Sequence, residues 1–151
     1  MKESTGVLLL DIEKAFDGTW HDGIIFKMKN YNFPLYLSKT VHSFLRNRKF
    51  QVSVEKKLSN VSDIKYGVPQ GAVLSPILYN IYTSDAPEID DCIRALYADD
   101  TALYTSSKYK ADITRGLRNG LKKYIDYFHQ WKVLINVEKT QVIFHTRRRT
   151  K

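Results

Sequence analysis

Apolar and polar residues follow two different periods along the chain, and each period predicts a different kind of element. The apolar run at residues 6–12 is short and continuous, which favours a buried strand that delivers Asp11 at its end. Residues 20–30 show helical spacing, and the interval from Thr19 to Asp22 is that of a capping box. The apolar face of this predicted helix consists of Ile24, Ile25 and Met28.

The middle of the chain predicts a helix, a hairpin, a loop and another helix. The first helix is expected directly after Pro34. Residues 50–54 and 61–66 read as the two strands of a hairpin, because Phe50, Val52 and Val54 alternate with polar residues and the second segment follows after a polar turn. Residues 67–71 contain two glycines and a proline and read as a loop. The apolar positions of the two helices are Leu37, Val41, Phe44 and Leu45 in the first and Leu74, Ile77, Leu78, Ile81 and Tyr82 in the second.

The last part of the chain predicts a second hairpin, a long amphipathic helix and a final strand. The hairpin joins two apolar strands at Asp99 and Asp100. The two strands, the helix and the final strand cover residues 93–97, 101–105, 111–131 and 141–145, and three arginines follow at 147–149. The residues of the helix expected to face inward are Ile113, Leu117, Leu121, Tyr124, Ile125 and Phe128.

This order of elements predicts an α+β fold, in which antiparallel strands form a sheet and the helices gather on one of its faces. No repeat, low-complexity stretch or linker interrupts the chain, so we expect a single domain over residues 1–151. The same order is compatible with many two-layer sandwiches. The pattern of elements therefore indicates a fold class without specifying a function.

The charge of the chain favours a polyanionic partner. Lys and Arg number 24 against 16 Asp and Glu, which gives a formal net charge of +8. Excess positive charge concentrates nucleic acid or an anionic membrane surface around a protein, although many basic proteins bind neither. With 43% hydrophobic and 26% charged residues, the composition is that of a globular protein rather than a disordered or fibrous one.

The cysteine and histidine content excludes several kinds of site. Cys92 is the only cysteine, so the sequence excludes an internal disulfide and a cysteine-based zinc site. The four histidines are too far apart in sequence to form a local metal motif. The apolar run at residues 7–10 is too short for a signal sequence or a membrane span. We expect an intracellular protein, cytoplasmic or nuclear, that is not secreted and does not insert into a membrane.

Three acidic residues are the strongest candidates for chemistry. Asp11 ends the first strand, and Asp99 with Asp100 lies at the tip of the second hairpin. Taken singly, an Asp at a strand end is commonly a helix cap, and an Asp pair between strands is commonly a turn. If the strands are neighbours, however, the carboxylates meet and repel by ~4 kcal/mol at ~4 Å and an effective dielectric near 20. Two divalent ions such as Mg²⁺ would compensate this charge and could catalyse a displacement between them.

Four segments, in this order, carry a resemblance to a known family. Residues 8–17 read LLLDIEKAFD, residues 67–76 read GVPQGAVLSP, residues 97–100 read YADD, and residues 131–141 read WKVLINVEKTQ. The ordered set resembles the palm motifs of reverse transcriptases. The segments FDGTWHDG at 16–23, FLRNR at 44–48 and RAL at 94–96 are similar to the jockey-like branch of the non-LTR retrotransposon enzymes. Group II intron maturases are the nearest alternative.

The resemblance implies a polymerase palm, with a ferredoxin-like antiparallel sheet and helices on one face. It implies that Asp11 and Asp99 hold two Mg²⁺ ions, which Mn²⁺ can replace. Asp100 would be a supporting ligand of these ions, and the backbone carbonyl of Ile12 would complete the metal site on the nucleotide side. The reaction would join a dNTP to a primer 3′-hydroxyl on an RNA template, in an intracellular ribonucleoprotein.

The resemblance also assigns residues around the nucleotide and the primer. Phe16 would exclude a ribose 2′-hydroxyl, although an ordinary core Phe is an alternative. Gln70 and Gly71 would lie over the incoming nucleotide. Tyr97 and Ala98 would lie beneath the primer end, although Tyr97 could also be an ordinary core residue. Lys139 would donate a proton to pyrophosphate, with a solvated surface lysine as the alternative. Arg46, Arg48 and Lys49 would contact backbone phosphates, with a solvated helix end as the alternative.

Two functional hypotheses follow from the extent of the resemblance, which covers residues 5–146. The chain would be a fragment of a longer polyprotein, with most of the fingers and thumb and a probable endonuclease encoded elsewhere, or a degenerate genomic copy. In the first hypothesis it is the core of an RNA-directed DNA polymerase. In the second it is a catalytically inactive retroelement remnant or a nucleic-acid-binding module. We expect the 151-residue chain alone to extend primers poorly.

Overall fold

The computed structural model describes residues 3–146, and in it the chain forms two compact units. The sheet unit comprises Met1–Ala15 and Asp85–Lys151, and the helical unit comprises Phe16–Ser84. In sequence, the helical unit is therefore inserted between the first strand of the sheet unit and the rest of that unit. The three arginines at 147–149, expected after the last strand, lie outside the described residues.

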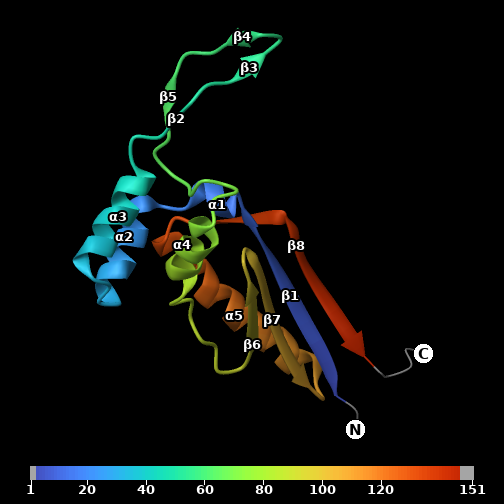
Figure 1. The fold of residues 1–151 in the computed structure, drawn as a ribbon. Helices are drawn as coiled ribbons and strands as arrows, with labels where there is room; N and C mark the ends of the chain where they lie inside the picture. Colours follow the sequence, from blue (N-terminus) through green and yellow to red (C-terminus); the bar gives the residue numbers. More distant parts are fainter. Residues whose placement is uncertain (1–2, 147–151) are drawn as a thin grey trace. The chain divides into compact units, whose positions relative to one another are not determined.

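The sheet unit contains one four-stranded sheet in the order β6-β7-β1-β8 (Figure 1). Every neighbouring pair in it is antiparallel, which confirms the predicted mixed fold with an antiparallel sheet. The strands are β1 (Ser4–Glu13), β6 (Ile93–Tyr97), β7 (Asp100–Ser107) and β8 (Leu134–Thr146). The first three match the predicted strands closely, whereas β8 begins seven residues before the predicted start at residue 141.

Strand β1 pairs with a neighbour on each side, and its apolar residues alternate in burial. Leu8 lies opposite Leu103 of β7 and opposite Val142 of β8. Leu8 and Leu10 are buried, while Leu9 is 38% exposed, because successive side chains of a strand point to opposite faces of the sheet. The apolar run predicted as a wholly buried strand is thus buried mainly on one face.

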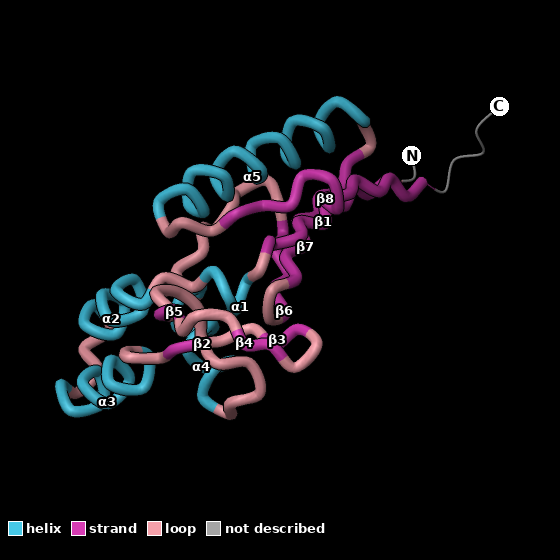
Figure 2. The backbone as a smooth tube through the Cα atoms, turned by 90° about the horizontal axis from the view of Figure 1, so that it is seen from above, coloured by secondary structure: helices cyan, strands magenta, loops and turns pink. Residues whose placement is uncertain are grey.

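Helix α5 (Lys110–Gln130) covers the buried face of the sheet, along β7, β1 and β8 (Figure 2). The helix approaches β1 closely at Gly6, where an added Cβ would lie 2.4 Å from Cγ2 of Ile113. The predicted inward face of α5 is largely confirmed. Ile125 is the exception at 47% exposure, since it lies about 100° round the helix from the buried Tyr124.

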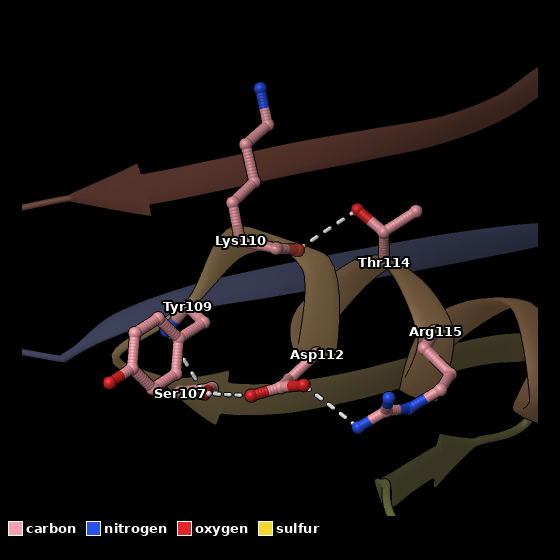
Figure 3. A network of polar contacts seen from close by, with 6 residues as sticks. All are labelled: Ser107, Tyr109, Lys110, Asp112, Thr114 and Arg115. Carbon is pink, nitrogen blue, oxygen red and sulfur yellow. Dashed lines mark hydrogen bonds and ion pairs between the residues drawn. The ribbon is translucent and has the colours of Figure 1, made fainter.

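Side chains at the start of α5 form a small polar network (Figure 3). The backbone N–H of Tyr109 donates to Oγ of Ser107, and this hydroxyl donates to Oδ2 of Asp112 at 3.1 Å. Oδ1 of Asp112 accepts from Arg115 at 2.8 Å. The network places a carboxylate in the first turn, where it interacts favourably with the helix dipole.

The helical unit contains the three helices expected from the apolar periodicity, which are α2 (His21–Asn30), α3 (Leu35–Leu45) and α4 (Leu74–Thr83). The short helix α1 (Ala15–Gly18), which leads into this unit, was not predicted. Helix α2 packs against both α3 and α4. The N-cap residue of α2 is Trp20, which makes no side-chain cap hydrogen bond, so the helix begins one residue later than the capping-box spacing from Thr19 predicts. Within residues 3–146, no helix is both long enough and apolar enough to cross a membrane.

The predicted hairpin of the helical unit is present as an extended arm (Figure 1). It consists of two short ladders, β2 (Lys49–Phe50) with β5 (Ser62–Asp63) and β3 (Ser53–Val54) with β4 (Lys57–Leu58). Every residue from 49 to 63 is exposed, so the arm adds nothing to the core of this unit.

The core of the helical unit contains a buried cation that the apolar pattern of α2 does not predict. Lys27 is 1% exposed, and its ammonium group donates to the backbone carbonyl of Tyr82. The same Nζ lies 5.3 Å from the centroid of the Tyr82 ring, a cation–π geometry. Burial raises the pKa of Tyr82 to about 12, so the phenol stays neutral beside the lysine. Ile24 and Met28 are buried as predicted, while Ile25 is half-buried.

The core of the sheet unit is open to a stability test. Leu103→Ala should lower the free energy of unfolding by ~2–5 kcal/mol, because this fully buried side chain would leave a cavity. Leu9→Ala is the matched control on the other face of the sheet and should cost less than ~1.5 kcal/mol, since its side chain is partly exposed. Urea denaturation measures both. Equal losses would contradict the assignment of the two faces.

Candidate functional site

The strand pairing brings the predicted acidic residues to the same end of the sheet. The ladder between β1 and β7 ends with Leu10 opposite Thr101. Asp11 and Asp100 are each the next residue beyond this pair, and Asp99 precedes Asp100 in the turn. Neighbouring strands therefore present one carboxylate each at adjacent positions, with a third beside them.

The burial of these carboxylates differs. Asp11 and Asp99 are half-buried, whereas Asp100 is exposed. Among residues 3–146, no three Asp, Glu, His or Cys side chains lie together in an arrangement that could hold a metal ion. Carboxylate oxygens are the donors that Mg²⁺ prefers, and their strands are neighbours. The donor type thus fits the ion, while convergence of the side chains on it stays a prediction.

The turn between β6 and β7 is unusually tight for its sequence. Tyr97 pairs with Asp100, so Ala98 and Asp99 alone form the turn. Ala98 has φ +53°, a left-handed conformation that is rare outside glycine, asparagine and aspartate and costs energy. Tyr97 is 82% exposed, which excludes a core role for its ring. A cavity of about 350 Å³ lies beside the turn, lined by Leu9, Leu10, Ala95, Leu96, Tyr97, Asp100, Thr101 and Ala102.

Lys139 lies in a bulge of β8 opposite the end of β1. Leu9 pairs with Gln141 but Asp11 pairs with Asn136, so β8 carries extra residues between these two pairs. The bulge is held internally, because the hydroxyl of Thr140 donates to the Asn136 carbonyl at 2.8 Å. The backbone N–H of Asp11 also donates to that hydroxyl, at 3.5 Å. The exposed Lys139 is therefore carried on a segment tied to Asp11.

In the helical unit, the loop at residues 67–71 is attached to α1 and to Thr19, the residue that follows this helix. The N–H of Val68 donates to the carbonyl of Phe16, and the N–H of Gly67 donates to that of Thr19, both at 2.8 Å. Gly67 has φ +81°, and a Cβ there would lie 2.6 Å from the Asp17 carbonyl oxygen. Only glycine fits this close approach.

Residues of α1, of the segment after the loop and of α4 join the loop in lining a cavity of about 440 Å³, whose residues are Phe16, Gln70, Gly71, Ala72, Val73, Ser75 and Pro76. The Phe16 ring packs on the buried Tyr79, with ring centroids 5.0 Å apart. Nε2 of Gln70 donates to Oδ1 of Asp17 at 2.9 Å. Gly71 has φ +83°, and among the described residues no atom lies within 4 Å of a Cβ built there. The cavity therefore has open space beside Gly71.

Arg48 donates to backbone carbonyls within the helical unit, while the phosphate contact expected of it stays a prediction. Its acceptors are the carbonyls of Leu45, Tyr66 and Gly67. His21 also contacts the Gly67 carbonyl, at 2.8 Å from Nε2. Burial lowers the pKa of the Arg48 guanidinium. This side chain thus anchors the end of α3 to the loop, a role that the sequence did not reveal.

The predicted site residues fall into two groups, one in each unit. The sheet unit carries Asp11, Ile12, Tyr97, Ala98, Asp99, Asp100 and Lys139, and the helical unit carries Phe16, Gln70 and Gly71. Each group is brought together locally. The roles assigned to the individual residues stay predictions.

Comparison with known proteins gives matches that extend over almost the whole chain. The family described as reverse transcriptase (RNA-dependent DNA polymerase) matches residues 1–150. The RNA-directed DNA polymerase from mobile element jockey of Drosophila melanogaster is 43% identical over 146 residues, which is 91% of this chain and 16% of that protein. The corresponding protein of Drosophila funebris is 39% identical over 144 residues, 90% of this chain and 15% of that protein. The chain therefore spans less than a fifth of the length of these relatives.

Solved structures with a similar fold include yeast telomerases. Apo telomerase from Candida tropicalis, truncated from its C-terminal domain, matches with a TM-score of 0.68 and 17% identity, over 97% of this chain and 32% of that one. Telomerase from the same organism in complex with a TWJ fragment of telomeric RNA matches with a TM-score of 0.66 and 15% identity, over 95% of this chain and 26% of that one. At this identity the likeness concerns the fold alone.

The role of Arg48 can be tested by amide hydrogen exchange. Arg48→Met should speed exchange at Gly67 and Val68 by at least ~10-fold, because losing hydrogen bonds from a charged donor costs ~1.5–3 kcal/mol. Arg46→Met is the control, since Arg46 is exposed on the same segment. Unchanged protection in the Arg48 variant would show that the loop does not depend on this side chain.

Proposed function

The chain belongs to the reverse transcriptase (RNA-dependent DNA polymerase) family, and from this premise we propose that it is the palm of a jockey-like non-LTR retrotransposon polymerase. The palm is the part of such an enzyme that carries the catalytic carboxylates. In this proposal the chain joins a dNTP to the 3′-hydroxyl of a DNA primer on an RNA template.

The observation that supports this function best is the register of the sheet. The end of the β1–β7 ladder sets Asp11 next to Asp100, and the tight turn adds Asp99. Carboxylates that converge from these neighbouring backbone positions would repel one another unless cations neutralise them. The long matches with RNA-directed DNA polymerases support the same conclusion independently.

The proposed roles in the sheet unit follow from the chemistry of each group. Asp11 and Asp99 hold two divalent cations, with Asp100 and the Ile12 carbonyl in support. When bound, Mg²⁺ ions would activate the primer hydroxyl and stabilise the charge that develops on the phosphate. Lys139, carried on the bulge tied to Asp11, donates a proton to the departing pyrophosphate.

The remaining roles concern the positions of the nucleotide and the primer. Phe16, braced by Tyr79, contacts the sugar of the dNTP, and its ring leaves no room for a 2′-hydroxyl. Gln70 and Gly71 contact the nucleotide from the loop. In the sheet unit, Tyr97 and Ala98 contact the primer end. These residues hold the reacting atoms close and aligned, which supplies a large share of the rate.

The decisive experiment is primer extension on an RNA template. The jockey polymerase, with its corresponding segment replaced by this chain, should extend the primer, and Asp99→Asn should reduce the rate at least ~100-fold through loss of metal binding. Asp126→Asn, an exposed carboxylate on α5, is the control. No synthesis by the unsubstituted chimera, despite proper folding, would favour an inactive remnant or a nucleic-acid-binding module.

Metal binding can be measured on the 151-residue chain itself. Mg²⁺ or Mn²⁺ at 100 times its Kd should stabilise the chain by ~2.7 kcal/mol and raise its Tm. Asp99→Asn should abolish the rise, whereas Asp126→Asn should retain it. A metal-bound structure in which the Asp11 and Asp99 carboxylates are more than ~8 Å apart would contradict the proposal, because paired ions lie only ~4 Å apart.

Sugar selection provides a separate test of the helical unit. In the same chimera, Phe16→Ala should admit ribonucleotides while most incorporation of dNTPs continues, because the ring that blocks the 2′-hydroxyl is removed. The ratio of kcat/KM for rNTP and dNTP measures the change. Unaltered discrimination would mean that Phe16 serves only the packing of Tyr79.

A further inference from the structure

We propose that Asp17 is a positioning residue, whose carboxylate fixes the orientation of the Gln70 amide in the nucleotide cavity. The inference rests on the proposed function, in which Gln70 contacts the incoming nucleotide. It extends that function to a residue next to Phe16 that touches neither metal nor primer in the scheme above. The consequence would be a defined hydrogen-bonding face of Gln70 toward the ligand.

The geometry that carries the inference is a single contact between segments far apart in sequence. Nε2 of Gln70 lies 2.9 Å from Oδ1 of Asp17, within the range of a normal hydrogen bond. The backbone around this contact is held independently, because Val68 bonds to Phe16 and Gly67 bonds to Thr19. The backbone thus sets the two side chains opposite each other, and the carboxylate then selects the rotamer of Gln70.

The chemistry of the pair determines which way the amide faces. A glutamine amide has a donor end and an acceptor end that are nearly equal in size, so its orientation depends on its partners. An ionised carboxylate only accepts hydrogen bonds. Nε2 of Gln70 must therefore face Asp17, which leaves the carbonyl oxygen Oε1 to accept a hydrogen bond from a ligand.

The location of Gln70 connects this orientation to the ligand. Gln70 lines the 440 Å³ cavity together with Phe16 and Gly71. The ring of Phe16 packs on Tyr79, and the carboxylate of the next residue, Asp17, accepts the hydrogen bond from Gln70. Two adjacent residues of α1 therefore fix the Phe16 ring and the Gln70 amide. A ligand in this cavity would meet an amide already oriented, which lowers the cost of ordering it on binding.

A positioning role is distinguishable from a structural one because the contact is exposed. Gln70 and Asp17 both lie at the surface, and the backbone bonds of the loop do not involve their side chains. Replacing Asp17 should therefore leave the fold intact. Asp17→Asn keeps the size of the side chain but can both donate and accept, so it removes the lock on the amide.

The first part of the test uses nuclear magnetic resonance on the 151-residue chain. The side-chain amide signals of Gln70, identified by their loss in Gln70→Glu, should shift in Asp17→Ala and Asp17→Asn. They should stay unchanged in Asp126→Ala, the control on α5. Gln70 signals that do not respond to either Asp17 variant would show that the bond is absent in solution and would overturn the inference.

The second part measures dNTP incorporation by the jockey chimera described above. Asp17→Ala should raise the KM for dNTP about three- to tenfold with little change in kcat, the pattern of lost ground-state binding. In a Gln70→Ala background, Asp17→Ala should have no further effect, because the group that it orients is gone. Asp17→Asn should fall between Asp17→Ala and the unsubstituted chimera.

The outcomes separate the inference from the function on which it rests. Additive effects of the two substitutions, or no effect of Asp17→Ala where Gln70→Ala raises KM, would overturn the positioning role. If Gln70→Ala leaves the KM unchanged, the proposed nucleotide contact fails, and the positioning role toward the nucleotide fails with it. The amide signals would then still report whether the Asp17 bond exists.

Discussion

The pairing of β1 on both of its sides is the constraint on which the sheet unit depends. Its neighbours β7 and β8 fix its register, and α5 fixes which face is buried. A slip by one residue would turn Leu8 and Leu10 to solvent and would carry Asp11 to the opposite face. The burial of Leu8 and Leu10 that stabilises the sheet therefore also fixes the register that sets Asp11 beside Asp100. No further interaction is needed to bring these two residues to adjacent positions.

The elements could be predicted from the sequence where an apolar period was long and regular. Helix α5 is of this kind, whereas β1 was predicted from a short, continuous apolar run; the observed bounds of both differ little from those expected. The early part of β8 was missed because the bulge between Asn136 and Gln141 interrupts the alternation of apolar and polar residues. The burial of Lys27 was also beyond prediction, since its acceptor is the carbonyl of Tyr82, on another helix.

Some residues of the candidate site could likewise be predicted from the sequence, and others could not. The acidic residues could be located because the strand pattern and the family motifs agree on them. The role of Arg48 could not, because its acceptors are backbone carbonyls, which leave no trace in the order of side chains. The contact between Asp17 and Gln70 likewise joins the single-turn helix α1 to a loop, and both are too short for apolar periodicity to carry information. Backbone geometry at Gly67, rather than any pattern, brings them together.

The central place of β1 has a consequence for synthesis on the ribosome. Every residue that pairs with β1 in the sheet lies beyond residue 100, so β1 is translated before all of its partners. The helical unit is complete in the growing polypeptide before either partner strand has been translated. During that interval β1 is an unpaired, apolar strand with both edges open, the kind of segment that associates with other chains. Slow translation through residues 16–100 would lengthen the time for which this strand is exposed.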